Sequence, residues 1–277
     1  MSANAISLSV LHYNTLASDK ADQSVHGFPY VDADILKWEN RGPRIVKHIL
    51  RDRPDFICLQ EVDRPDFFDI HLKAEGYDGV FVPKVNSKEG LAIYWNVGRF
   101  VPERQDIISY GKHYKDDQSQ VACFMHMHNA TNYKSKFIIG TTHLKAKANP
   151  VSEHIRMMQC RVLAKYVNEH TTGKYHQTPF IMTGDMNDTP TSQPIRIIRE
   201  TGLHSAYMFD KDIVTTCKKR GPDMTKRMID YIWYYNIDME SADMLPTQFP
   251  DIGLPSDDQP SDHLALSATF QTYQDDM

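Results

Sequence analysis

Phe56–Glu61 reads FICLQE, an apolar run that ends in an acid and follows Pro54. Phe180–Asp185 reads FIMTGD and repeats this arrangement after Pro179. Short apolar runs bounded by a proline indicate buried strands, and a segment with helical spacing of apolar residues precedes each one. A buried strand that ends in a carboxylate places that charge at the rim of a sheet, where a metal ion or a water molecule can reach it. The predicted fold depends on this repeated unit.

The remaining chain supplies further strands and helices around the two units. Strand-like runs lie at 6–14, 79–82, 90–95, 121–128, 137–144, 229–235 and 264–270. Apolar residues recur with helical spacing at 34–51, 67–75, 154–168 and 194–200. We interpret the repeat as two halves that each supply one sheet. The sequence therefore predicts an α/β fold, a four-layer α/β sandwich of two mixed β-sheets packed face to face and flanked by helices. No linker divides the chain, so we expect one catalytic domain over residues 1–277.

Composition narrows the class of protein. The net charge of -5 over 277 residues does not indicate a nucleic-acid-binding domain, because such domains are usually basic; acids used to bind a metal would leave that class open. The four cysteines form no CxxC pair, which favours a reducing compartment. The start of the chain has no secretory pattern, and no apolar run reaches membrane-spanning length. We expect an intracellular, cytoplasmic monomer that does not associate with a membrane, and the sequence does not identify a protein partner.

Glu61 is a candidate metal ligand. Mg²⁺ prefers oxygen ligands and usually takes only one or two carboxylates from a protein. A single glutamate at a strand end, with Asp262 and Asn14 close by, would suit that ion. For Glu61 alone, an exposed loop acid that follows a core strand is the more common explanation.

The tetrapeptide Gly184–Asn187 is a more specific signal. Gly184 permits a tight turn at the sheet rim, and an extended backbone would direct Asp185 and Asn187 to the same side. An aspartate can take a proton from water while a neutral asparagine positions that water or a phosphate. An Asx turn that closes the strand explains the same residues and stays open as an alternative.

Two late apolar runs begin with residues that suit a charged pair. Asp230 begins one, and His263 begins the other. An aspartate that accepts from one imidazole nitrogen fixes the tautomer and stabilises the charged ring beside a phosphate. We also expect His143 and Lys145 to share one face of a strand as a cationic clamp for an anion. A single histidine is more often a packing or surface residue, but these positions all lie where apolar runs meet loops.

Other catalytic patterns are missing or weak. The sequence contains no GxSxG, HExxH, GxGxxG or GK[ST] phosphate-binding motif. His126 and His128 alternate on a predicted strand, but no third ligand lies nearby in sequence, so they are weak evidence for zinc.

Five motifs follow one another in the order of a known superfamily. They are Leu59–Asp63 (LQEVD), Thr142–Lys145 (THLK), Gly184–Asn187 (GDMN), Ile229–Tyr231 (IDY) and Ser261–His263 (SDH). With these motifs the chain resembles the endonuclease/exonuclease/phosphatase superfamily, and Tyr13–Leu16 (YNTL) is similar to its first motif. Within the superfamily the chain resembles nocturnin and the carbon-catabolite-repressor-type deadenylases. The strings that carry this are Leu36–Arg41 (LKWENR), Phe81–Lys84 (FVPK), His143–Lys147 (HLKAK) and Asp230–Tyr234 (DYIWY).

The resemblance implies a role for each candidate residue. Mg²⁺, with Mn²⁺ as a substitute, would be held by Glu61, Asn14 and Asp262. Asp185 would activate the attacking water, and Asn187 would orient that water or the phosphate. His143 and His263 would steady the phosphoryl oxygens, with Asp230 orienting His263. The substrate-side cations would be Lys84, Lys145, Lys147 and Arg220. Nocturnin-like chains carry arginine at the position of Lys147, and lysine offers a point charge in place of a bidentate fork.

The resemblance also implies a substrate that contains adenine. Either the 3′ end of RNA, including poly(A), or the 2′-phosphate of NADP(H) would be hydrolysed, and the acidic net charge favours the smaller substrate. Alternatives are a 2′,5′-oligoadenylate phosphodiesterase, a DNA repair nuclease, for which a more basic chain is expected, or a non-catalytic RNA-binding scaffold with the same fold. A scaffold would be expected to lose Glu61, Asp185 or His263, and all three are present.

Overall fold

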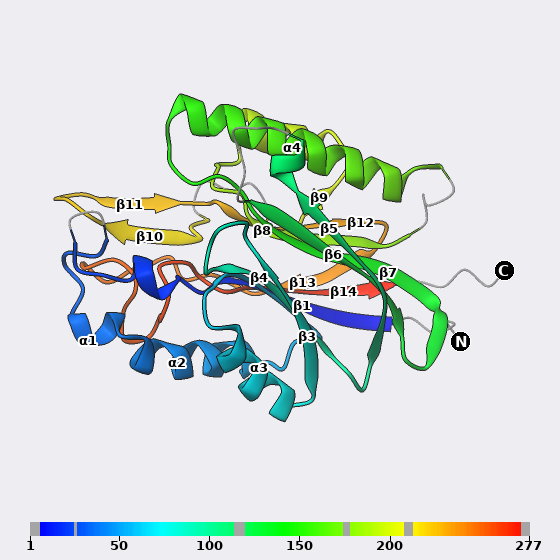
Figure 1. The fold of residues 1–277 in the computed structure, drawn as a ribbon, viewed down its shortest axis with the longest axis horizontal. Coiled ribbons are helices and arrows are strands. Elements are labelled where there is room, and N and C mark those ends of the chain that lie inside the picture. Colours follow the sequence, from blue (N-terminus) through cyan, green and yellow to red (C-terminus); the bar gives the residue numbers. More distant parts are fainter. Residues whose placement is uncertain (1–5, 25–26, 114–119, 174–177, 208–212, 273–277) are drawn as a thin grey trace.

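The computed structural model describes residues 6–24, 27–113, 120–173, 178–207 and 213–272. Two six-stranded sheets lie face to face between helices (Figure 1). The first sheet contains β1 (Ile6–Asn14), β2 (Phe56–Val62), β3 (Tyr77–Pro83), β4 (Gly90–Asn96), β13 (Asp238–Ala242) and β14 (Leu266–Thr272). The second contains β5 (Phe100–Ser109), β6 (Val121–Asn129), β7 (Asn132–His143), β8 (Phe180–Asp185), β9 (His204–Ser205) and β12 (Asp230–Tyr235).

Both sheets mix parallel and antiparallel pairs. The strand order is β13-β14-β1-β2-β4-β3 in the first sheet and β5-β6-β7-β8-β12-β9 in the second. β1 and β2 run parallel, as do β7 and β8, while their other neighbours are antiparallel. One continuous apolar cluster joins the inner faces of the two sheets, with Phe56 and Ile93 from the first and Phe137 and Ile181 from the second.

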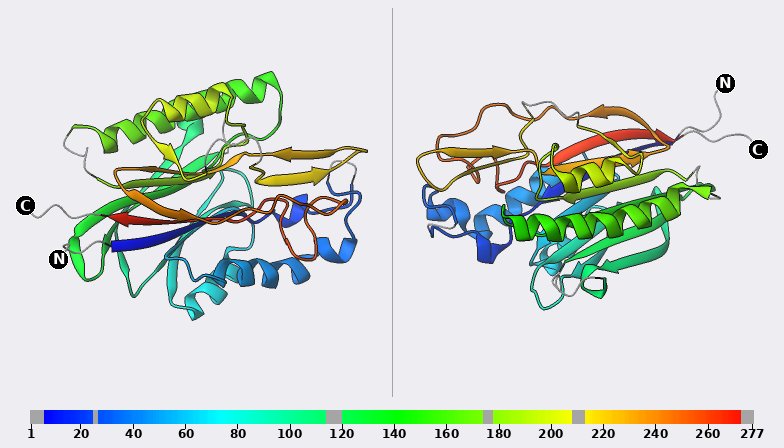
Figure 2. Two further views of the ribbon diagram at one scale, coloured as in Figure 1. Left: turned by 180° about the vertical axis from the view of Figure 1, so that it is seen from behind. Right: turned by 90° about the horizontal axis from the view of Figure 1, so that it is seen from above.

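Helices cover the outer face of each sheet. α2 (Trp38–Leu50) and α3 (Pro65–Ala74) pack on the first sheet, where Ile45 and Phe68 join an apolar cluster with Leu59. α4 (Pro150–Thr171) and α5 (Gln193–Arg199) lie over the second sheet (Figure 2). The predicted four-layer α/β sandwich of two mixed sheets is therefore confirmed. A short α1 (Ala33–Leu36), the turn η1 (Ser18–Lys20) and the two-stranded β10 (Thr216–Lys219) and β11 (Met224–Arg227) lie near one end of the sandwich.

Local structure departs from the sequence prediction in several places. The helix expected at 34–51 is two helices, because Lys37 has an extended backbone (ψ 134°) between α1 and α2. The edge strand β5 was not predicted, because residues 101–105 are exposed and mostly polar and so lack the alternation of a half-buried strand. The strand β10 and its partner β11 were likewise missed.

The parallel pairs place the candidate residues at one end of the sandwich. Carboxyl ends of adjacent parallel strands meet at the same sheet edge. In the first sheet Asn14 is in register with Gln60, so Asn14 and Glu61 end neighbouring strands. In the second sheet His143 is in register with Asp185, and antiparallel β12 brings Asp230 beside the same aspartate.

Candidate active site

Asp185 lies at the centre of the candidate residues. Its Oδ2 accepts a 2.9 Å hydrogen bond from Asn14 Nδ2. The same oxygen lies 3.4 Å from His143 Nε2 and 3.8 Å from His263 Nε2. The carboxylate is almost fully buried, with 2% of its surface exposed. Groups from both sheets thus converge on one buried oxygen, as the sequence interpretation required.

His263 is held by a buried aspartate. Its Nδ1 lies 2.9 Å and 3.1 Å from the two oxygens of Asp230, which leaves Nε2 directed at Asp185. Asp230 also contacts His12 Nε2 at 3.0 Å and accepts a 2.6 Å hydrogen bond from Thr215 Oγ1. Since a carboxylate only accepts, His263 Nδ1 carries the proton in this pair.

Acidic neighbours make His263 a cation. Burial opposes the charged ring, but the charges of Asp230, Asp262 and Asp185 outweigh burial and raise the pKa of His263 to about 9. Burial likewise opposes the charge of Asp230, yet His263 and His12 hold its pKa below the usual range of an aspartate. The two groups therefore form a buried ion pair at neutral pH.

His143 has the opposite environment. Its Nδ1 lies 3.3 Å from Lys84 Nζ, and its Nε2 lies 4.0 Å from Glu61 Oε1. Burial and then the charge of Lys84 hold the pKa of His143 well below its usual value. An ammonium only donates, so Nδ1 accepts from Lys84 and the proton of the neutral ring sits on Nε2, which faces Asp185.

Glu61 closes this side of the site. Its backbone is left-handed (φ 56°), and its Oε2 accepts a 3.0 Å hydrogen bond from the Ala17 amide. Its Oε1 lies 3.0 Å from Lys20 Nζ. Burial by itself raises the pKa of Glu61, but the charges of Lys20 and Lys84 and the hydrogen bond from the Ala17 amide outweigh burial and hold it well below the usual range. Glu61 is therefore an anion at neutral pH.

Burial has the dominant effect on Asp185 itself. Burial and then the charge of Asp230 raise the pKa of Asp185 above its ordinary value, although His263 and the Asn187 amide oppose them. A carboxylate with a raised pKa is a stronger base than an exposed one. The geometry therefore places a buried carboxylate of raised pKa between a cationic imidazole and a neutral imidazole.

The sequence model of the Endonuclease/Exonuclease/phosphatase family matches residues 11–263. The chain belongs to this family. The family predicted from the motifs is thereby confirmed, and it is a family of enzymes that hydrolyse phosphate esters.

Known relatives agree with this placement in the Endonuclease/Exonuclease/phosphatase family. Nocturnin of Homo sapiens is 31% identical over 286 residues, which cover 94% of this chain and 64% of nocturnin. The CCR4-Not complex 3′-5′-exoribonuclease subunit Ccr4 of Emericella nidulans is 25% identical, over 95% of this chain and 52% of that protein. This chain thus spans about half to two-thirds of the length of these relatives.

Solved structures of the family share the fold. The human nocturnin catalytic domain with bound sulfate anion superimposes with a TM-score of 0.74 at 28% identity, over 96% of both chains. ANGEL2, solved as a 2′,3′-cyclic phosphatase in complex with adenosine-2′,3′-vanadate, superimposes with a TM-score of 0.83 at 22% identity, over 99% of this chain and 98% of that one.

The acidic residues of this family member fit a divalent cation. Asp262 Oδ1 is a buried acceptor without a hydrogen-bond partner, while its Oδ2 pairs with Lys218. Buried acceptors without partners are rare in folded proteins, and hard carboxylate oxygens suit Mg²⁺ or Mn²⁺. Asn14 is engaged elsewhere, since its oxygen accepts from the Leu16 amide at 3.1 Å and its nitrogen donates to Asp185. Both oxygens of Glu61 are also engaged, by the Ala17 amide and by Lys20, so Asp262 Oδ1 is the acceptor of the three predicted ligands that has no hydrogen-bond partner.

Asn187 is placed differently from the expectation. β8 ends at Asp185, and Asn187 has a left-handed backbone (φ 52°), so no extended stretch aligns the two side chains. The Asn187 amide donates to Asp185 Oδ1 at 2.9 Å, which is the Asx turn left open as an alternative. Its side chain donates to the Leu144 carbonyl at 3.1 Å. The turn and the catalytic arrangement coexist, because each uses a different oxygen of Asp185.

Three predicted cations lie on loops outside the cluster. β7 ends at His143, so the strand argument that placed Lys145 on the same face was wrong. The carbonyls of Lys145 and Lys147 accept from Arg156, which fixes the backbone of this loop. Arg220 donates to the Gly27 carbonyl at 3.1 Å. Their roles toward a substrate stay predictions.

Several residues of the site were not found from the sequence. Lys20 bridges Glu61 and Glu89, and Arg41 is fully buried and donates to the carbonyls of Thr15, Leu16 and Pro260. Arg41 thereby ties the loop after Asn14 to the loop before Asp262. A charged residue at a buried position of an amphipathic helix was the available signal for Arg41. Lys20 gave none, because its partners are distant in sequence.

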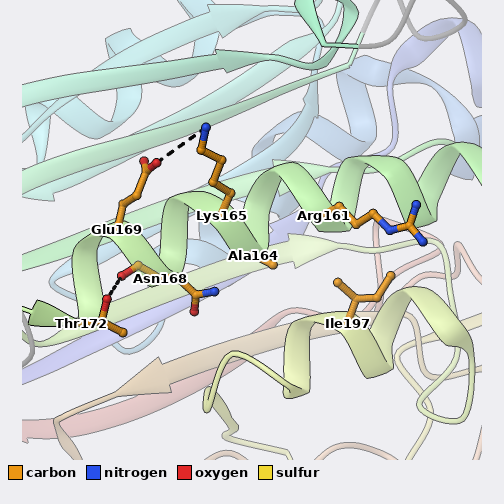
Figure 3. Close-up of a pocket in the computed structure, with 7 residues that line it drawn as sticks. All are labelled: Arg161, Ala164, Lys165, Asn168, Glu169, Thr172 and Ile197. Carbon is orange, nitrogen blue, oxygen red and sulfur yellow. Dashed lines mark hydrogen bonds and ion pairs between the residues drawn. The ribbon is translucent and has the colours of Figure 1, made fainter.

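A depression of 490 Å³ lies elsewhere on this family member, between α4 and α5 (Figure 3). Its lining includes the ion pair between Lys165 and Glu169 but no predicted site residue. Across the described segments, every helix is too short or too polar to span a bilayer.

Proposed function

We propose that this chain is a Mg²⁺-dependent phosphoesterase of the nocturnin and deadenylase type, acting on phosphate esters of adenine-containing substrates. The observation that carries the proposal is the placement of a buried aspartate, Asp185, between a charged and a neutral imidazole, with Glu61 4.0 Å from the neutral one. This set combines a proton acceptor with donors for the negative oxygens of a phosphate. Family membership and the relatives' printed activities support the same reaction class.

Asp185 takes the proton from the attacking water. The Asn14 amide donates to Asp185 Oδ2, and the Asn187 backbone amide donates to Oδ1, so the carboxylate cannot rotate freely. Burial and the charge of Asp230 raise its pKa, which makes the carboxylate a stronger base than an exposed aspartate.

The two imidazoles stabilise the phosphoryl group. His263 donates from Nε2 as a cation, and Asp230 keeps it charged and oriented. His143 donates from Nε2 as a neutral ring, and Lys84 fixes that tautomer. Glu61, Asp262 and Asn14 would hold the divalent ion, which when bound would supply positive charge that neutralises the phosphate oxygens.

The charges around the site favour a small substrate over a long RNA. The lysines nearest the cluster are paired with acids, Lys20 and Lys84 with Glu89 and Lys218 with Asp262, and the net charge is -5. Tracking a long strand usually requires a broad positive groove. We therefore favour the 2′-phosphate of NADP(H), with Lys145, Lys147 and Arg220 as further cations toward the substrate. Hydrolysis at the 3′ end of RNA is the second candidate, supported by the similarity to Ccr4.

The test is a side-by-side measurement of turnover. NADP, a poly(A) oligonucleotide, a 2′,5′-linked oligoadenylate and an abasic DNA duplex are compared in Mg²⁺, in Mn²⁺ and with chelator. We expect phosphate release from NADP in either metal and none with chelator. Hydrolysis that survives the chelator would overturn the metal role. Lack of turnover on all four substrates, by protein that binds poly(A), would support the scaffold alternative.

A further inference from the structure

A second group of histidine and aspartate side chains lies on the outer face of the second sheet. Asp106 from β5, His126 from β6 and His170 from α4 each present one potential ligand atom, and these atoms lie within 4.8 Å of one another. The three residues are half-buried between α4 and the sheet. Figure 1 shows α4 lying across β5 and β6. The sequence offered no third ligand near His126, and the tertiary structure brings Asp106 and His170 next to it.

Each ligand atom is already oriented by its surroundings. His170 Nδ1 lies 2.8 Å from the Tyr166 carbonyl, which can only accept, so Nδ1 carries a proton and Nε2 is the nitrogen that faces the other two residues. The ring also stacks on Tyr166, with centroids 4.1 Å apart. Tyr166 Oη donates to Asp106 Oδ2 at 2.8 Å. A hydrogen bond to the second nitrogen of a histidine and to a carboxylate is the usual support for metal ligands.

His126 completes the set from the neighbouring strand. Its Nε2 lies 2.9 Å from Asp106 Oδ2. Burial, and then the nearby charge of Arg104, lower the pKa of His126 despite its bond to Asp106, so the ring is neutral at pH 7. Ligand atoms in a tetrahedral zinc site stand about 3.4 Å apart, given Zn–N and Zn–O bonds of about 2.1 Å. Small side-chain movements would bring the three atoms to that spacing.

A cation already sits among the three ligand atoms. Arg104 Nη2 lies 2.8 Å from Asp106 Oδ2, 2.7 Å from His126 Nε2 and 3.5 Å from His170 Nε2. The Arg104 side chain is 56% exposed, so it can leave for solvent without breaking the core. The site thus accommodates positive charge at the point that all three ligands face.

We propose that Asp106, His126 and His170 form a second metal site, selective for a zinc-like ion and separate from the Mg²⁺ site. Two imidazoles and one carboxylate suit Zn²⁺ and disfavour Mg²⁺, which prefers oxygen ligands. Arg104 moves out when the ion binds. The bound metal links the C-terminal end of α4 to the edge strand β5, so its role is to stabilise this side of the second sheet.

The experiment measures how many equivalents of Zn²⁺ the protein binds and with what affinity. Zinc binding is followed by competition with a chromophoric chelator in the presence of excess Mg²⁺. Wild type is compared with His126→Ala, His170→Ala and the matched control His128→Ala, which changes a histidine on the same strand. We expect the first two variants to bind one equivalent fewer than wild type, with at least a 100-fold loss of affinity at that site, and the control to keep it. Phosphoesterase turnover in Mg²⁺ should be the same in all four proteins.

Arg104→Ala should change the zinc affinity in the opposite direction. Removal of the competing cation should tighten zinc binding about tenfold, whereas a merely structural ion pair would leave it unchanged. Cobalt absorption spectra of wild type and Arg104→Ala would identify nitrogen and oxygen ligands in tetrahedral geometry. Equal zinc stoichiometry in wild type, His126→Ala and His170→Ala would overturn the proposal. An equal loss in His128→Ala would also overturn it.

Discussion

His143 and His263 lie on either side of Asp185 and have opposite electrostatic surroundings. Three carboxylates, led by Asp230, surround His263 and raise its pKa to about 9. Burial and then the charge of Lys84 lower the pKa of His143 and keep the ring neutral. The same residue type, histidine, is thus a cation at position 263 and a neutral hydrogen-bond donor at position 143. The difference shows that residue type alone does not determine the protonation state of a histidine, because the charges of its neighbours shift its pKa.

We expect the largest effect on turnover when the carboxylate that both histidines face is removed. Asp185→Asn keeps the shape but loses the base, so we expect kcat to fall by between about 10² and 10⁴-fold. Turnover and circular dichroism are measured in parallel, with the exposed Asp66→Asn as control. A near wild-type rate in Asp185→Asn would remove the base assignment and with it the centre of the comparison.

Replacing the charged histidine, His263, should lower kcat nearly as much. His263→Gln retains a hydrogen-bond donor but removes the positive charge, and we expect a loss of about 10² to 10³ in kcat. The measurement is kcat against pH for wild type and variant at saturating substrate. Wild-type activity should decline as pH rises through about 9, where His263 loses its proton, and the variant should lack this decline. A decline that persists unchanged in the variant would mean that another group causes it.

Stability should follow the same ionisation. The folded pKa of His263 is raised from 6.5 to about 9, so its contribution is complete below about pH 6.5 and is lost as pH rises through about 9. The loss corresponds to about 3 kcal/mol of unfolding free energy, counted once for the coupled pair with Asp230. Urea unfolding at several pH values between 6 and 10 measures it. In Asp230→Asn the slope should be much smaller, and an equal slope would contradict the ion pair.

The smallest effect is expected on the neutral side. His143→Gln replaces one neutral donor with another, so we expect kcat to fall only about tenfold, well short of the loss in His263→Gln. The direct comparison of the two glutamine variants in one assay tests the asymmetry. If both variants lose activity equally, the two histidines do not differ in charge during turnover.

The sequence predicted the two acid-tipped strands well because local pattern and local chemistry agree there. Phe56–Glu61 and Phe180–Asp185 are apolar, short and bounded by prolines, so a buried strand with a polar end is the only consistent local structure. The edge strand β5 was not predicted because most of its residues are exposed and polar, so they lack the apolar pattern of a buried strand.

Site details were predicted less completely. The partners Asp230 and His263 were inferred correctly as neighbours, whereas the left-handed turn at Asn187 and the end of β7 before Lys145 depend on backbone geometry that residue spacing does not report. Lys20, Arg41 and His12 were missed because their contacts join segments far apart in the chain.

By itself the sequence determined the layered α/β architecture, the family motifs and the identity of the acids and histidines, because apolar periodicity and residue chemistry are local properties. Only the tertiary structure decided which histidine is charged, which oxygen of Asp185 faces the two histidines, and that Asp106, His126 and His170 meet under α4. The physical reason is that pKa values and ligand sets depend on distances of a few ångströms between groups that the chain separates by tens or hundreds of residues.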